Sequence, residues 1–129
     1  MPNNTTTAAA DRTPTGSGAQ AEDIAAGFLA RNGLTIIARN YRCRGGEIDL
    51  VCRDGSTIVF VEVRLRRSRT FGGAAASVTT AKRQRIILAS MHYLHSQRLD
   101  DADCRFDCIL LDQLSANRVE WVKDAFAVE

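Results

Sequence analysis

Apolar residues recur with the period of a helix in two segments of the chain. In the first segment the apolar stripe runs from Ala21 to Leu29, and Asn32-Gly33 behind it is a suitable helix C-cap. The second begins with threonines, whose hydroxyl suits the N-cap position because it can accept a hydrogen bond from a free backbone N–H. The predicted helices run from about Ala19 to Arg31 and from Thr79 or Thr80 to about His95 or Gln97.

Shorter apolar runs are typical of β-strands. Two of them flank Asp54-Gly55, a dipeptide that favours a tight hairpin. The order of the elements, α-β-β-β-α-β-β, predicts an α/β fold in which helices pack on a mixed sheet. The predicted strands cover residues 34–43, 45–51, 58–64, 105–111 and 118–123.

The pattern also divides the chain into a tail and one domain. Residues 1–18 are mostly Thr, Ala, Asn, Gly and Ser with two prolines, and they show no apolar periodicity, so we predict a disordered tail. Residues 19–129 are enough for one hydrophobic core. No apolar run reaches the roughly 20 residues of a membrane span, and no secretory signal begins the chain. We therefore expect a cytoplasmic protein without a membrane partner.

The net charge of +2 conceals an uneven distribution along the chain. Between Arg53 and Arg85 eight basic residues stand against two acidic ones, a balance of +6. From Asp100 to Glu129 eight acidic residues stand against three basic ones, a balance of −5. A basic segment beside acidic residues suits a polyanion held next to a metal ion. The alternative is a solvated loop rich in arginine.

Acidic residues interrupt both apolar runs of the predicted hairpin. Glu47 and Asp49 are two residues apart and leave the same face of one strand, as Glu62 and Arg64 do on the next. If Asp54-Gly55 forms a two-residue loop, the register places Glu47 opposite Glu62 and Asp49 on the diagonal. A four-residue loop places Asp49 directly opposite Glu62. Either register brings two or three carboxylates within roughly 5–8 Å of one another.

Carboxylates at that distance repel one another, and a divalent cation relieves the repulsion. Mg²⁺ prefers oxygen ligands of this kind. The pattern therefore favours a site for Mg²⁺ or Mn²⁺ at Asp49 and Glu62, with Glu47 as a further ligand or a residue behind the ligands. The alternative is a pair of exposed acids on a strand, although both residues lie within strongly apolar runs, where exposure is less natural.

Several short motifs carry a family resemblance. They are Gly46-Glu47-Ile48-Asp49-Leu50, Phe60-Val61-Glu62-Val63-Arg64, Phe71-Gly72-Gly73-Ala74, Ser77-Val78-Thr79, Cys104-Arg105-Phe106-Asp107 and Trp121-Val122-Lys123-Asp124-Ala125-Phe126. On these motifs the chain resembles the YraN family of small bacterial proteins. That family is similar to the restriction-endonuclease-like PD-(D/E)xK superfamily, and especially to the archaeal Holliday-junction resolvases.

The resemblance implies a restriction-endonuclease-like fold and a set of site residues. The superfamily's nuclease motif is an aspartate, a gap, and then Asp or Glu followed two residues later by lysine. Asp49 and Glu62 match the two acids. Glu22, at the edge of the first helix's apolar stripe, is similar to the additional metal-binding acid of the resolvase-like members.

The third position of the motif departs from the superfamily, because Arg64 stands where lysine is expected. Arginine keeps its proton, with a pKa above about 12, and cannot act as the base. Arg64 can still orient a water or stabilise charge on the phosphate. Lys82 is a possible substitute, because it shares a helical stripe with Ile86 and Tyr93 and should face the sheet near the helix N-terminus.

The resemblance implies nucleic acid as the partner, DNA rather than RNA, and branched DNA as the substrate. The two-fold symmetry of a DNA junction is compatible with a homodimer. If the protein is an enzyme, it is a metal-dependent endonuclease with Asp49, Glu62, Arg64 and Lys82 as catalytic residues. The alternatives are a non-catalytic DNA- or RNA-binding module of the same fold and a protein-interaction module using the acidic C-terminal third. The predicted phosphate contacts are Arg66, Arg67, Arg69, Arg83 and Arg85.

Overall fold

The computed structural model describes residues 17–65, 78–112 and 118–128. Within these residues the order of the elements is the predicted α-β-β-β-α-β-β, and each predicted element is present with bounds shifted by a few residues. The predicted tail lies almost entirely outside the described residues. The elements are α1 (Ser17–Arg31), β2 (Thr35–Cys43), β3 (Gly46–Asp54), β4 (Thr57–Leu65), α3 (Thr80–Ser96), β5 (Cys104–Leu111) and β6 (Val119–Phe126).

The strands of the described residues form one mixed sheet in the order β2-β3-β4-β5-β6. Neighbouring strands are antiparallel except β4 and β5, which are parallel. A parallel pair needs a crossover, and α3 lies in the connection between these two strands. The predicted α/β fold with a mixed sheet is confirmed.

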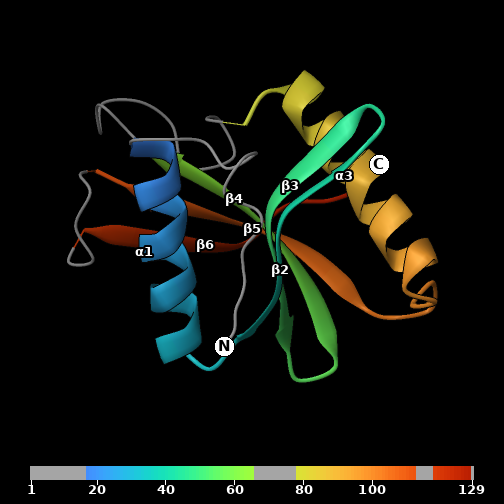
Figure 1. Cartoon of the computed structure of the whole chain (residues 1–129), viewed down its shortest axis with the longest axis horizontal. Coiled ribbons are helices and arrows are strands. Elements are labelled where there is room, and N and C mark those ends of the chain that lie inside the picture. Colours follow the sequence, from blue (N-terminus) through green and yellow to red (C-terminus); the bar gives the residue numbers. More distant parts are fainter. Residues whose placement is uncertain (1–16, 66–77, 113–117, 129) are drawn as a thin grey trace.

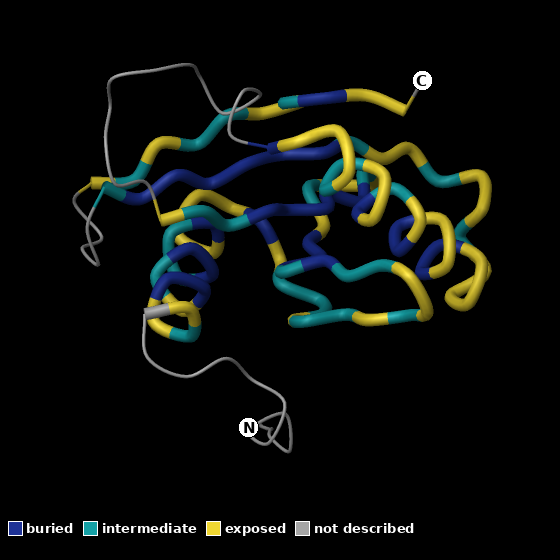
Figure 2. The backbone as a smooth tube through the Cα atoms, turned by 90° about the horizontal axis from the view of Figure 1, so that it is seen from above, coloured by how far each residue is buried: buried dark blue, intermediate teal, exposed yellow. Residues whose placement is uncertain are grey.

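The two helices cover opposite faces of the sheet, so that the molecule has three layers (Figure 1). Alternate residues of β4 serve the two cores: Phe60 packs with Ile86 of α3, whereas Val59 packs with Leu29 of α1. Figure 2 shows that the buried backbone is concentrated in the central strands, with exposed segments on the outside. The side chains at the end of β4 are therefore held between two packed layers.

The end of α1 and the start of α3 lie where the sequence predicts. After α1, Gly33 adopts φ 95°, and the amides of Gly33 and Leu34 bond back to Ala30 and Leu29, which is the Schellman arrangement. At the start of α3, Thr79 Oγ1 accepts a hydrogen bond from the backbone N–H of Lys82 at 3.1 Å. Among the described residues neither helix is long and apolar enough to cross a bilayer.

The β3–β4 hairpin resolves which carboxylates face each other. Asp54 pairs with Thr57, so that Gly55 takes the first central position of the turn with φ 63°. The loop is therefore Gly55-Ser56, and neither the predicted Asp54-Gly55 loop nor the four-residue loop is present. Continuing this register places Asp49 opposite Glu62, which is the pairing predicted for the four-residue loop. The register with Glu47 opposite Glu62 is not adopted, because glycine rather than Asp54 occupies the turn position that needs a positive φ.

Candidate functional site

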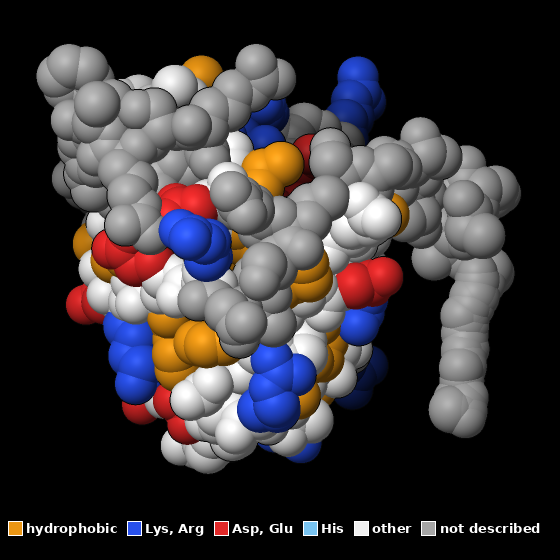
Figure 3. Space-filling view, turned by 90° about the vertical axis from the view of Figure 1, so that its left-hand side faces the viewer, with side chains coloured by type: hydrophobic (Ala, Val, Ile, Leu, Met, Phe, Trp, Pro, Cys, Tyr) orange, Lys and Arg blue, Asp and Glu red, His pale blue; other side chains and the backbone are white. Residues whose placement is uncertain are grey.

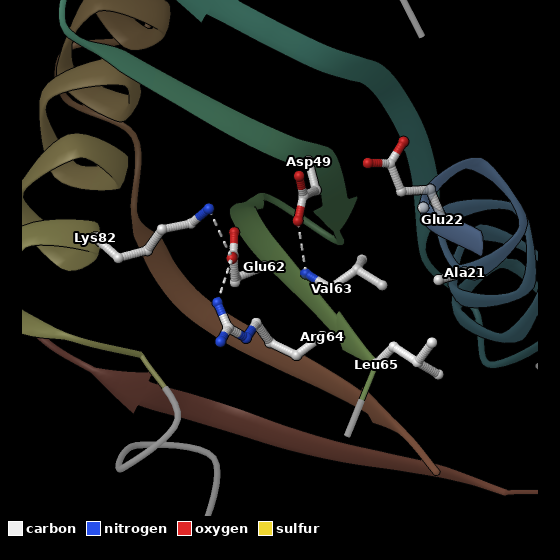
Figure 4. A pocket seen from close by; sticks show the side chains of 9 residues that line it. Ala21, Glu22, Asp49, Glu62, Val63, Arg64, Leu65 and Lys82 are labelled. Atoms are coloured by element: carbon white, nitrogen blue, oxygen red, sulfur yellow. Dashed lines mark hydrogen bonds and ion pairs between the residues drawn. The ribbon is translucent and has the colours of Figure 1, made fainter. Parts of the chain in front are cut away.

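An open cavity of about 280 Å³ lies where α1, α3 and the ends of β3 and β4 meet. Figure 4 shows carboxylates from three of these elements directed toward it, with a lysine approaching from α3. Its walls combine these charged side chains with small and aliphatic ones. The cavity is lined by Gly18, Ala21, Glu22, Asp49, Glu62, Val63, Arg64, Leu65 and Lys82.

The position of Asp49 follows from the way the two strands separate. The ladder between β3 and β4 ends at the pair Leu50–Val61. Beyond it, the backbone N–H of Val63 donates a hydrogen bond to Asp49 Oδ2 at 2.8 Å, so that a side chain replaces the missing strand partner. This bond fixes the carboxyl of Asp49 over β4, beside Glu62.

Glu62 is 3% exposed and has two cationic neighbours. Lys82 Nζ, from α3, lies 3.3 Å from Glu62 Oε2, and Arg64 Nη1, two residues along β4, lies 3.7 Å from the same oxygen. Both predicted cationic residues are therefore at the site. Lys82 is the more buried of the two, because its side chain is 22% exposed against 39% for Arg64.

Burial controls the protonation of the two facing acids. Burial first, and the charge of Asp49 second, raise the pKa of Glu62 to about 8, while Lys82 works in the opposite direction. Burial likewise raises the pKa of Asp49, against the hydrogen bond from Val63. At neutral pH the pair of facing carboxyls therefore retains one proton.

Glu22 supplies the third acid of the cavity. It projects from α1 on the other side of Asp49 from Glu62, as Figure 4 shows. Burial, followed by the charge of Asp49, raises its pKa to about 7, whereas a hydrogen bond to the Asn40 side chain lowers it. The structure thus brings together Asp49, Glu62 and Glu22, as the sequence and the family resemblance suggested.

Glu47 lies apart from this group. Its carboxyl is 3.8 Å from Arg42 Nε on β2, and it does not line the cavity. It acts on the site only at a distance, where its charge contributes to the raised pKa of Asp49. Its predicted metal-binding role finds no support in this placement.

The donors suit a small, hard divalent cation. In the described parts of the chain, no three His, Cys, Asp or Glu residues are close enough to enclose a metal ion. Mg²⁺ needs no such enclosure, because it usually keeps several waters and binds through one or two carboxylates together with substrate phosphates. Asp49 and Glu62 fit that requirement, and the cation would replace the proton that they share.

Of the five arginines predicted to contact phosphate, two lie among the described residues. Arg66, Arg67 and Arg69 lie outside the described residues. Arg83 points back along its helix, where its Nε donates to the Val78 carbonyl and its guanidinium lies 5.6 Å from the centre of the Phe126 ring. Arg85 is exposed.

A second buried acid lies away from the cavity. Asp107 is 0% exposed and accepts hydrogen bonds from Arg105 Nε at 3.0 Å, Trp121 Nε1 at 2.9 Å and the Asp124 N–H at 2.9 Å. The sequence gives no signal for the donors on β6, because they lie far from Asp107 along the chain. These bonds hold β6 against β5.

Comparisons with known proteins agree with the motifs. The family model described as "Uncharacterised protein family UPF0102" matches residues 21–111. A UPF0102 protein of Dechloromonas aromatica is 53% identical over 120 residues, covering 93% of this chain and 96% of the relative. One of Methylobacillus flagellatus is 57% identical over 110 residues, covering 85% and 96%. The predicted membership of the YraN family, which carries the description UPF0102, is confirmed, and the placement in the nuclease superfamily stays a prediction.

Proposed function

This chain belongs to the UPF0102 family, and we propose that it binds nucleic acid and hydrolyses phosphodiester bonds with Mg²⁺ or Mn²⁺ held by Asp49 and Glu62. The observation that carries the proposal is the pair itself: a buried carboxyl, Glu62, and a half-buried one, Asp49, face each other at the wall of an open cavity. Desolvated acids of like charge in a cavity are typical of functional sites rather than of stabilising ones.

The protein's own groups divide the work around a phosphate. A divalent cation bound there supplies an activated water and neutralises charge on the phosphoryl oxygens. Asp49 is oriented for this ligation by the Val63 amide, and Glu62 loses its proton when it becomes a ligand. Glu22, across the cavity, is placed to accept a hydrogen bond from water in the cavity or to take up its proton.

Lys82 takes the part that the superfamily motif gives to a lysine on the strand. Its ammonium is closer to Glu62 than the guanidinium of Arg64, and it lies in a less exposed position. Both cations can donate hydrogen bonds to phosphate oxygens as negative charge develops there. We therefore assign charge stabilisation to Lys82 and substrate orientation to Arg64.

A non-catalytic nucleic-acid-binding module is the second candidate. The observation that favours it is the contact between Lys82 and Glu62, because the ammonium, 3.3 Å from Glu62 Oε2, already occupies the space beside the oxygen that a metal ion would need. In that case the cavity receives a phosphate without cleaving it. DNA, and branched DNA in particular, is the partner that the resemblance suggests for either candidate.

Cleavage of labelled junction, flap and duplex DNA and of RNA, in Mg²⁺ and in Mn²⁺, tests the proposal. We expect metal-dependent cleavage that Asp49→Asn reduces by roughly 100-fold or more, since the asparagine keeps an acceptor for Val63 but loses the charge. Glu47→Gln is the matched control, because it removes an acid from the same strand outside the cavity.

Three results separate the candidates. Cleavage that depends on Asp49 and not on Glu47 supports the endonuclease. Salt-sensitive binding without cleavage in either metal supports the non-catalytic module. Cleavage that survives Asp49→Asn contradicts the assignment of the site.

A further inference from the structure

The turn between β2 and β3 lies directly on α3. A Cβ atom on Gly46 would stand 2.4 Å from the Arg85 carbonyl oxygen and 3.0 Å from the Ala89 nitrogen, so the two backbones touch and only glycine fits. Gly45 adopts φ 83°, and a Cβ there would reach Leu88 at 3.0 Å. Figure 1 shows this hairpin bending over the N-terminal half of the helix. The position of the turn relative to α3 is therefore tightly defined.

This contact brings the turn that contains Arg44 against the part of α3 that contains Arg85. Arg44 precedes the turn glycines, and Arg85 contributes the carbonyl that Gly46 touches; both are exposed. Neither side chain forms an ion pair with another described residue. Arg42, two residues before Arg44, is partly balanced by Glu47 at 3.8 Å. Like charges left without counter-charges repel one another and together attract an anion.

Arg85 lies on α3 and Arg44 lies in the turn that leads into β3, and both α3 and β3 contribute residues to the cavity. Gly46 is three residues from Asp49 along β3, or about 10 Å. Lys82 is three residues from Arg85 along α3, an axial rise of about 4.5 Å. A nucleic-acid strand advances about 3.4 Å per nucleotide along the helix axis. The distance from the arginine-bearing segments to the cavity therefore corresponds to a few nucleotides.

On the α1 side, the described residues carry charges of both signs. Figure 3 shows acidic and basic side chains of the described residues mixed on that face. Arg39 of β2, near α1, is already neutralised by Asp23, with Nη1 and Oδ1 2.7 Å apart. Charge complementarity therefore points to the α3 side.

We propose that Arg44, on the β2–β3 turn, and Arg85, on α3, form a phosphate-binding surface that holds a nucleic-acid backbone beside the Asp49–Glu62 cavity. The inference rests on the proposed binding of nucleic acid, but it does not require cleavage. It assigns the turn a function beyond joining two strands. The close backbone contact at Gly46 holds the two segments that carry these arginines together.

Fluorescence anisotropy with labelled single-stranded and duplex DNA and RNA, without divalent ions and over a series of salt concentrations, tests the surface. We expect Arg44→Ala/Arg85→Ala to weaken binding severalfold and to reduce the slope of log K against log salt by about 1 for each arginine. The matched control is Arg53→Ala/Arg98→Ala, which removes two exposed charges from the far end of β3 and from just beyond α3.

A third variant separates geometry from charge. Gly46→Ala keeps every charge but forces the turn away from the Arg85 carbonyl, so we expect it to weaken binding as well. Circular dichroism and urea unfolding verify that it is folded. If it is not, the arginine variants alone decide.

The outcomes distinguish the inference from the proposed function. A double arginine variant with the affinity and salt slope of its control overturns the surface, and Asp49-dependent cleavage would then still support the endonuclease. If the double arginine variant binds more weakly and the wild-type protein does not cleave, the result supports the surface and removes the endonuclease. A wild-type protein that binds neither DNA nor RNA overturns both.

Discussion

Replacing Glu62 by glutamine should change how the stability of the protein depends on pH. The carboxyl of Glu62 has its pKa raised from 4.5 to about 8 in the folded state. The folded protein therefore holds this proton more tightly than the unfolded chain does. The resulting stabilisation is complete below pH 4.5 and is lost as the pH rises towards 8. Glutamine imitates the protonated form at every pH and removes this dependence.

The size of the change in unfolding free energy follows from the shift in the pKa of Glu62. One pKa unit corresponds to 1.36 kcal/mol, so a shift of about 3.5 units is worth on the order of 5 kcal/mol over the whole range. Between pH 5 and pH 7 the wild-type protein should lose about 3 kcal/mol more unfolding free energy than Glu62→Gln. Glu22 titrates in the same range with its pKa of about 7, but it does so in both proteins and cancels in the difference.

Urea unfolding at pH 5, 6, 7 and 8, without divalent ions, measures this difference directly. Glu47→Gln is the control, because the same chemical change is made at a half-exposed carboxyl paired with Arg42. We expect its pH profile to match that of the wild-type protein. Parallel profiles for the wild-type protein and Glu62→Gln would refute the buried, proton-sharing pair on which the proposed metal site depends.

Two further predictions concern positions away from the cavity. Asp107→Ala removes the buried acceptor of the donors from Arg105, Trp121 and the Asp124 backbone, and it should lower the free energy of unfolding in urea by about 3–5 kcal/mol. The loss for Asp107→Asn should be smaller, and a cost below about 1 kcal/mol for Asp107→Ala would contradict the network. Gly33→Ala should cost about 1–2 kcal/mol, because φ is 95° although no atom lies within 4 Å of the added Cβ. Gly27→Ala, inside α1, is its contrast and should be neutral or stabilising by up to about 1 kcal/mol. Equal effects of the two glycine substitutions would disprove the backbone explanation.

The elements of the fold were readable from local patterns. The apolar period, the glycine after α1 and the threonine before α3 act through bonds between residues close in sequence, so the helices and their ends follow from the chain alone. The acids of the hairpin were identified for a similar reason, because residues two apart on a strand always leave the same face.

The relations between elements required the three-dimensional structure. Two registers of the hairpin were compatible with Asp54-Gly55, and the choice between them depended on which residue takes the positive φ. The distance of 3.3 Å between Lys82 and Glu62 depends on how far α3 lies above the sheet, which no spacing in the sequence encodes. The same holds for Glu47, which turned to Arg42 on the neighbouring strand.

The sequence by itself determined the order and type of the elements, the family and the acids worth examining, because each is written in neighbouring residues. Only the tertiary structure decided which of those acids share a cavity, how strongly burial raises the pKa of Glu62, and which surface residues lie beside them. The β2–β3 turn illustrates the difference, because no spacing in the sequence shows that Gly46 touches the backbone of α3 at Arg85. Contacts between distant segments depend on packing of the whole domain, and the chemistry of the site depends on those contacts.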